Sequence, residues 1–288
     1  MISTSRRSFL KTAGVTVAAS CVGARRLSAK GTKLPMGIEL YSVREQMAKD
    51  LEGTLAKVRA AGYEVAESAG FVNHTAAEYR KAVDNAGLKL ISGHYTLSLL
   101  RTQLDKIIED AHTAGMQYIV NSSSGGQHRK PSSERELSLD DWRWVADEMN
   151  KIGEKTKAAG IKLGMHNHTP EFATLDGVLV YDELLKLTNP ELVAFQMDCG
   201  WVFASGHDPV QFLKKTPKRF PLLHVKDMVM QPDGKEKITV LGKGSIDYGP
   251  ILKAATAAKY FYVEQEEYDM EVFEELRLDA EYMRHLQV

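Results

Sequence analysis

The sequence predicts one α/β domain, a single (β/α)8 barrel of the TIM type, and three observations carry this prediction. Short apolar runs alternate with amphipathic stretches eight times along the chain, as expected of repeated strand-helix units. About 255 residues follow residue 30, which is a typical length for one such barrel. A doubly wound open sheet would normally have a glycine-rich phosphate turn after an early strand, but Gly242-Lys-Gly244 comes late and lacks the spacing.

The expected strands are short apolar runs with polar residues towards their carboxyl ends. We place them at residues 36–41, 63–68, 89–94, 117–121, 161–167, 192–198, 221–226 and 260–266. In a parallel barrel the carboxyl ends of the strands and the loops after them form the active face. Polar side chains at these ends are therefore expected to converge.

The expected helices have clear start and stop signals. We place them at residues 50–61, 75–86, 99–114, 139–159, 179–188, 208–215, 247–258 and 271–286. An Ala-Gly pair ends four of them, with glycine at positions 62, 87, 115 and 160, where the helix must turn into the next strand. Asp208-Pro209 and Asp247-Tyr-Gly-Pro250 are typical helix starts, with aspartate as the N-cap and proline in the first turn.

Residues 1–29 are predicted to be a removable export signal of the twin-arginine type, so that the barrel spans residues 30–288. Arg6-Arg7 precedes the apolar pair Phe9-Leu10, and an uncharged run of small and apolar residues follows from Ala13 to Gly23. This run is about half as long as a bilayer-spanning helix, so no membrane span is expected in the mature chain. We expect a periplasmic protein, with lipid attachment at Cys21 as a minor alternative.

The composition favours a small-molecule partner over a nucleic acid. The chain is 43% hydrophobic and 26% charged, with a formal net charge of −1, so it has no basic excess that would attract nucleic acid. Cys199 is the single cysteine outside the predicted signal, and no disulfide framework is expected. These features leave homo-oligomer formation open.

Four of the expected strands end in groups that could hold a metal ion. They are His166-Asn-His168 with Glu171 after it, Ala194-Phe-Gln-Met-Asp198, His224-Val-Lys226 and Glu264-Gln-Glu266. Taken singly, an inward histidine is more often a core residue, and Asp198 before Cys199-Gly200 can simply cap a turn. Buried strands are normally filled with apolar side chains, so the joint occurrence at four strand ends favours one shared site.

Segments spread over almost the whole mature chain carry a family resemblance. They are Gly37 to Arg44, His166 to Phe172, Asp198 to Trp201, Gly206 to Pro209, Phe220 to Asp227, Gly242 to Asp247 and Tyr262 to Glu266. Together they resemble the sugar phosphate isomerase/epimerase family, the xylose-isomerase-like barrels that include inosose dehydratases and ketose 3-epimerases.

The resemblance implies one divalent ion, often manganese, held by Asp198, His224 and Glu264 and by one ligand from the fifth strand. The glutamate that epimerases have on that strand is replaced by Gly164, so Glu171, or else His166 or His168, must supply this ligand. Epimerases also have a histidine at the place of Trp201. This departure argues against assuming ketose 3-epimerase activity.

The residue types themselves are suited to metal-assisted proton transfer. A mixed oxygen and imidazole set suits manganese, magnesium, cobalt or zinc, and the resemblance makes manganese the first expectation among them. Such an ion can polarise a sugar carbonyl and stabilise the enediolate formed when a proton leaves the adjacent carbon. We assign metal ligation to Glu171, Asp198, His224 and Glu264, proton transfer to Glu67, His94, His166, His168 and Lys226, and substrate contacts to Glu39, Tyr41, Trp201 and Glu266.

These assignments predict a metal-dependent isomerase or epimerase that acts on a sugar or keto-sugar. A lyase or hydratase acting on a 3-keto-sugar, glycoside or inosose is the first alternative, since the same deprotonation can lead to elimination. A non-catalytic periplasmic sugar-binding barrel is the second. The absence of a phosphate-binding loop, together with the export signal, favours a non-phosphorylated substrate.

Overall fold

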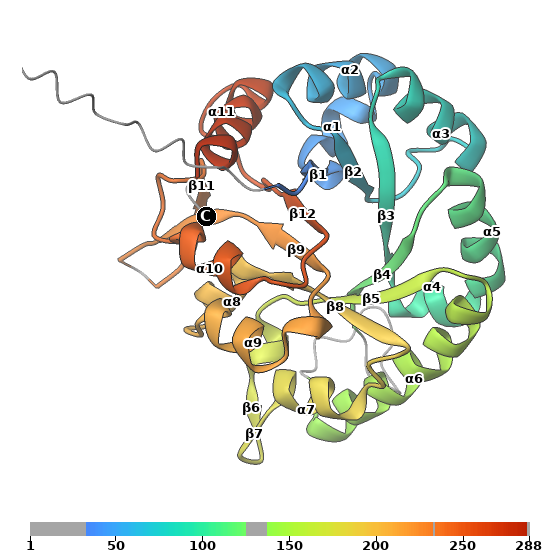
Figure 1. The fold of residues 1–288 in the computed structure, drawn as a ribbon, viewed down its shortest axis with the longest axis vertical. Coiled ribbons are helices and arrows are strands. Elements are labelled where there is room, and N and C mark those ends of the chain that lie inside the picture. Colours follow the sequence, from blue (N-terminus) through green and yellow to red (C-terminus); the bar gives the residue numbers. More distant parts are fainter. Residues whose placement is uncertain (1–32, 125–136, 233, 287–288) are drawn as a thin grey trace, which may run out of the picture.

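Eight parallel strands close into a barrel in the computed structural model, which describes residues 33–124, 137–232 and 234–286. The barrel strands are β1 (Met36–Glu39), β2 (Val65–Ser68), β3 (Lys89–Thr96), β4 (Tyr118–Ser123), β5 (Lys162–His166), β8 (Val193–Asp198), β9 (Leu222–Val225) and β12 (Tyr260–Val263). Their order around the barrel is β1-β12-β9-β8-β5-β4-β3-β2, and every neighbouring pair is parallel. The predicted TIM barrel is confirmed, with β1 closing against β12 (Figure 1).

Helices form the outer ring of the barrel (Figure 1). They are α1 (Arg44–Met47), α2 (Leu51–Ala61), α3 (Ala76–Asn85), α4 (Leu97–Thr102), α5 (Leu104–Ala114), α6 (Leu139–Ala158), α7 (Val180–Leu187), α8 (Cys199–Ala204), α9 (Pro209–Lys215), α10 (Tyr248–Ala254) and α11 (Val272–His285). Asp208 and Asp247 cap α9 and α10 as predicted. Gly62 and Gly115 adopt left-handed conformations at the ends of α2 and α5, again as predicted.

The single helix expected at residues 99–114 is wrong, because two helices occupy this region. Thr96 caps α4, accepting a hydrogen bond from the backbone N–H of Leu99 at 3.3 Å. The chain then leaves the helical conformation at Gln103, where φ is −135° and ψ is 23°, and α5 begins at Leu104. The apolar spacing continues across this break, so the pattern alone does not reveal it.

Two small antiparallel hairpins extend from the barrel and were not expected from the sequence. The first joins β6 (Thr174–Leu175) to β7 (Val178–Leu179), and the second joins β10 (Asp227–Met230) to β11 (Glu236–Thr239). Both lie in loops that follow the carboxyl ends of barrel strands, β5 and β9 respectively. They are therefore on the face of the barrel where polar residues are expected to converge.

Asp227 organises the loop that follows the second hairpin. Its buried carboxylate accepts hydrogen bonds of 2.9 to 3.0 Å from the backbone N–H groups of Met228, Gly242, Gly244 and Ile246. A Cβ atom at Gly244 would lie 2.2 Å from Asp227 Oδ1, so this close approach requires glycine. The Gly242-Lys-Gly244 motif thus holds a carboxylate of the protein itself.

An apolar layer closes the lower part of the barrel interior. Val65, Tyr118, Val120, Leu222 and Tyr262 form a buried cluster separate from the main core, which lies between the strands and the helices. Side chains two residues further along a strand point in the same direction. The next inward layer therefore lies directly above this floor and contains polar side chains.

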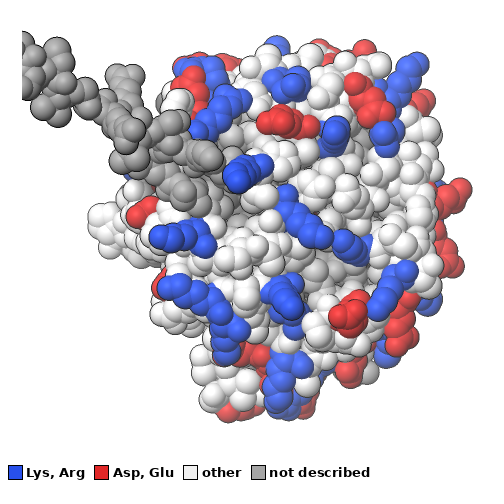
Figure 2. Space-filling model, viewed as in Figure 1, with Lys and Arg blue, Asp and Glu red and all other residues white. Residues whose placement is uncertain are grey.

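Charged residues of both signs are interspersed on the face that Figure 2 shows. Among the described residues, no helix is long and apolar enough to cross a membrane. The predicted export signal at residues 1–29, including Cys21, lies outside the described part of the chain. Its presence and the periplasmic location remain predictions.

Candidate active site

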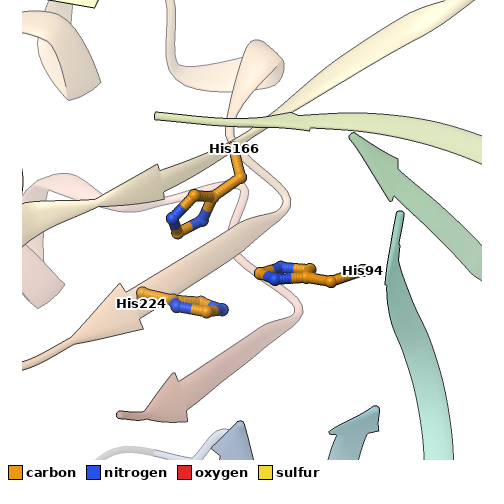
Figure 3. A group of neighbouring side chains, drawn as sticks. All are labelled: His94, His166 and His224. Carbon is orange, nitrogen blue, oxygen red and sulfur yellow. The ribbon is translucent and has the colours of Figure 1, made fainter. Parts of the chain in front are cut away.

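Three imidazoles converge above the apolar floor, at the carboxyl end of the barrel (Figure 3). His94 is on β3, His166 ends β5 and His224 is on β9. The ring centres of His166 and His224 are 4.6 Å apart, and His94 lies 5.0 Å from the first and 5.3 Å from the second. Buried imidazoles this close require hydrogen-bond partners for their nitrogens.

Glu67 is the acidic partner below these rings. Its fully buried carboxylate lies 2.6 Å from His224 Nε2 and 3.0 Å from His94 Nε2. Burial would raise the pKa of Glu67, but the charges of His94 and hydrogen bonds from His224 and His94 outweigh burial and hold this pKa well below its usual value. Glu67 is therefore an ionised acceptor that fixes both rings.

Gln196 is a further member of this network and was missed in the sequence analysis. It is fully buried on β8, where its amide contacts Glu67, His94 and His166. The sequence did contain a signal: Gln196 lies two residues before Asp198, so both side chains point inward. Its partners lie on distant strands, and the sequence does not show which polar groups it meets.

Glu39 provides a second buried carboxyl group, and its pKa is shifted in the opposite direction from that of Glu67. It ends β1, is fully buried, and its Oε2 atom has no hydrogen-bond partner among the described residues. Burial and the nearby charge of Glu67 raise the pKa of Glu39 well above its usual value. Glu39 therefore keeps its proton to a higher pH than Glu67 does.

Three candidate ligands predicted from the sequence meet at one point. One atom each from Asp198, His224 and Glu264 lies within 4.8 Å of the other two, and all three residues are buried. His224 Nδ1 is 3.0 Å from Glu264 Oε2 and 3.9 Å from Asp198 Oδ2. Two donor atoms that share one cation at about 2.1 Å lie about 3 to 4 Å apart, so these distances match a metal site.

The local fold directs one oxygen of Asp198 towards this point. Asp198 Oδ1 caps α8 by accepting the backbone N–H of Trp201 at 2.9 Å. Oδ2 is buried and receives no hydrogen bond among the described residues. Asp198 thus caps the turn with one oxygen, as predicted, and directs its other oxygen towards His224.

Lys226 balances the charge of these carboxylates. Its Nζ atom lies 3.2 Å from Asp198 Oδ2, 2.9 Å from Glu264 Oε2 and 2.5 Å from Glu266 Oε1. It also lies 4.7 Å from the centre of the Trp201 ring. Burial would lower the pKa of Lys226, but Asp198, Glu264 and Glu266 raise it, so Lys226 remains a cation.

The structure favours His166 over Glu171 as the contribution of the fifth strand. His166 Nε2 lies 4.0 Å from Asp198 Oδ2. Glu171 is instead in a short turn after β5, where its carboxylate accepts the backbone N–H of His168 at 2.8 Å. It is not among the described clusters with metal-site geometry, although burial raises its pKa to about 7. Metal ligation by Glu171 therefore stays a prediction without geometric support.

His168 completes the group at the mouth of the barrel. Its ring centre lies 4.7 Å from that of His166 and 6.0 Å from that of Trp201. Burial, partly offset by the charge of Asp198, lowers the pKa of His168. This imidazole is therefore neutral near neutral pH.

A cavity of about 490 Å³ opens above these side chains. Its lining contains Glu39, Tyr41, His94, His166, His168, Glu264 and Glu266, together with Ala69, Gly70, Tyr95, Thr96, Leu99 and Ser122. Most of the predicted site residues therefore face one space, and Glu67, Asp198, His224 and Lys226 contact those that line it. None of the described lining residues is an arginine or a lysine.

A closed parallel barrel with histidine and carboxylate side chains gathered at its carboxyl end is the architecture of TIM-barrel enzymes that act on small molecules. Residues 55–286 match the xylose isomerase-like TIM barrel family, and the chain belongs to this family.

Relatives in this family include an inosose dehydratase of Clostridium beijerinckii, which is 27% identical over 209 residues. The match covers 63% of this chain and 69% of the dehydratase. A crystal structure of a sugar phosphate isomerase/epimerase from Parabacteroides distasonis superposes with a TM-score of 0.73 and 26% identity, covering 93% of this chain and 98% of the other. The structure of the IOLI protein with a bound zinc atom has the same fold, with 16% identity, a TM-score of 0.66, and coverage of 86% and 96% of the two chains.

Proposed function

We propose that this protein is a metal-dependent lyase that removes water from a non-phosphorylated keto-sugar or inosose, beginning with loss of a proton next to the ketone. The observation that carries the proposal is the convergence of Asp198, His224 and Glu264 beside His166, at a cavity lined by groups able to move protons.

The described side chains fit a divalent cation. The set consists of carboxylate oxygens and imidazole nitrogens, and Asp198 Oδ2 is a buried oxygen that faces the ammonium group of Lys226, so the position already favours positive charge. Asp198, His224 and Glu264 would hold the ion, with His166 as the fourth ligand. When bound, the ion would polarise the ketone and make the neighbouring carbon more acidic. The identity of the metal, for which we predict manganese, is open to zinc, magnesium and cobalt.

Opposite pKa shifts within one cavity supply a base and an acid. His168 is kept neutral by burial and so is suited to take the proton from carbon. Burial raises the pKa of Glu39, and the charge of Glu67 raises the pKa of His94 against the effect of burial. Glu39 and His94 are therefore suited to protonate the departing hydroxyl group, which leaves as water while a carbon-carbon double bond forms.

Lys226 is better suited to holding charge than to moving protons. It contacts three carboxylates and its raised pKa keeps the ammonium group protonated. Its predicted part in proton transfer remains open, and its position beside Asp198 and Glu264 favours an electrostatic role.

The charge of the cavity supports a substrate without phosphate. Glu264 and Glu266 line it, and the described lining residues provide no guanidinium or ammonium group for a phosphate. Kinetics on matched free and phosphorylated ketoses would test this point. A strong preference for the phosphorylated substrate would overturn it.

Elimination is favoured over epimerisation by the dehydratase relative and by Trp201, which stands where epimerases have a histidine. An isomerase or epimerase is the second candidate, since the Parabacteroides distasonis structure bears that name and the first chemical step is shared. Purified protein, stripped and reloaded with each metal, should be incubated with inosose and keto-sugars in deuterium oxide. Metal-dependent ultraviolet absorbance of an unsaturated product supports the lyase, whereas deuterium incorporation into an intact sugar supports the second candidate.

A further inference from the structure

Gln196 makes four short polar contacts inside the polar network. Its Oε1 atom lies 2.7 Å from His94 Nε2 and 3.0 Å from His166 Nδ1. Its Nε2 atom donates to both oxygens of Glu67, at 2.9 and 2.8 Å. The side chain is fully buried, so no contact with bulk water replaces these bonds.

These contacts determine the orientation of the amide. Gln196 Nε2 is 2.9 and 2.8 Å from the two Glu67 oxygens, and a carboxyl group keeps at least one acceptor oxygen in either protonation state, so the NH2 group of Gln196 faces Glu67. The amide oxygen must then face the two imidazoles, and each of them must donate an N–H to it. For His166 this places the proton on Nδ1.

The proton on Nδ1 determines which nitrogen of His166 is free. In a neutral imidazole one nitrogen carries the proton and the other has a lone pair. With Nδ1–H directed at Gln196, the lone pair is on Nε2, which lies 4.0 Å from Asp198 Oδ2 on the side of the proposed cation site. A nitrogen must be unprotonated to bind a metal, and the bond made by the other nitrogen commonly fixes which one it is.

We infer that Gln196 is a positioning residue that holds His166 in the tautomer with a free Nε2 atom, which makes His166 a ligand of the divalent cation. The same amide keeps Glu67 directed towards His224. This inference rests on the proposed function for its cation, but the tautomer itself is a property of the cation-free protein.

The test measures the tautomer of His166 by ¹⁵N NMR of the imidazole nitrogens in cation-free protein, with a His166→Gln variant to assign the signals. In the wild type, Nδ1 should carry the proton and Nε2 should not. Gln196→Leu removes the acceptor oxygen with little change in side-chain volume. His166 should then be a mixture of its two tautomers. Gln196→Met removes the same acceptor with an unbranched side chain and should give the same mixture.

The second readout is the affinity of the protein for Co²⁺, which is measured from the visible absorption of the bound ion. Loss of an outer hydrogen bond to a metal-binding histidine typically weakens metal affinity by about 10- to 100-fold, which is the loss expected for Gln196→Leu. The matched control is Ser92→Ala, which removes a buried hydrogen bond to Tyr262 elsewhere in the barrel interior. It should change neither the tautomer nor the affinity.

Two results would overturn the inference: a wild-type His166 protonated on Nε2, or Gln196→Leu and Gln196→Met variants with unchanged tautomer and affinity. A wild-type protein that binds no divalent cation would instead refute the proposed function. The tautomer measurement would still test Gln196 in that case. Circular dichroism of each variant verifies the fold, and Gln196→Met provides a second loss of the acceptor if the leucine variant does not fold.

Discussion

Replacing Lys226 by methionine tests the charge balance at the centre of the barrel. The change removes an ammonium group that lies 2.5 to 3.2 Å from oxygens of Asp198, Glu264 and Glu266, and it leaves the volume of the side chain nearly unchanged. Three buried or half-buried carboxylates then lose their shared cation. A divalent ion at the proposed site would restore the missing positive charge.

The expected loss follows from these distances. Unit charges about 3 Å apart attract by roughly 5 kcal/mol at an effective dielectric constant of about 20. Desolvation of the ammonium group offsets much of this attraction, and breaking a buried ion pair by removing one partner usually costs about 3 to 5 kcal/mol. We therefore expect the free energy of unfolding of cation-free Lys226→Met to fall by about 3 to 5 kcal/mol. For a chain of this size that is a decrease in melting temperature of roughly 6 to 20 °C.

Urea denaturation and thermal melts, in chelator and then in excess Mn²⁺ or Zn²⁺, measure this effect. The cation should stabilise Lys226→Met more than the wild type, because ion and ammonium no longer compete for the same oxygens. Lys237→Met is the matched control: this lysine is exposed and pairs with Asp269, so its loss should cost less than about 1 kcal/mol. A cation-free Lys226→Met as stable as the wild type, or one that divalent ions do not stabilise further, would refute the reasoning.

Three further predictions concern the cation site, the buried acid Asp279 and the loop held by Asp227. Asp198→Asn and Glu264→Gln should each prevent the protein from retaining one metal ion per chain, as measured by elemental analysis after dialysis. If both variants retained the full metal content, the proposed cation site would be wrong. Asp279 is buried, which raises its pKa to about 7, so the folded state binds a proton that the unfolded state releases near pH 4. The free energy of unfolding should therefore decrease by up to about 1.4 kcal/mol per pH unit as pH rises from about 4 to about 7, and urea titrations should show a flatter profile for Asp279→Asn. Asp227→Asn turns an NH2 group towards two backbone N–H donors. The free energy of unfolding, measured by the same urea titration, should fall by about 2 to 5 kcal/mol. A decrease below about 1 kcal/mol would show that the loop 240–246 does not depend on this carboxylate.

The barrel and the direction of its polar side chains could be predicted because both depend on local pattern. Apolar runs, Ala-Gly helix ends and Asp caps mark each strand-helix unit, and period-two alternation along a strand shows that His224 points where Leu222 points. The predicted convergence of Asp198, His224 and Glu264 followed from the carboxyl ends of the strands and from the family resemblance, and the structure places these three residues together.

The pairing within the polar layer could not be predicted from the same information. Gln196 meets His94, which is 102 residues away in sequence, and Glu67, which is 129 residues away. Such contacts depend on barrel closure and strand register, neither of which leaves a local pattern. For the same reason the sequence could not choose between Glu171 and His166, since the choice depends on a turn that directs the Glu171 carboxylate to the backbone of His168.

The polar layer also joins the two halves of the chain. Glu67 and His94 come from the first four barrel strands, Gln196 and His224 come from the last four, and every hydrogen bond between these pairs crosses the lumen. A fragment containing either half alone would therefore leave charged or polar groups without partners in an apolar interior, where each unsatisfied group is costly. The chemistry and the cooperativity of folding thus depend on the same few hydrogen bonds, since Glu67 from the first half orients His224, a proposed cation ligand, from the second.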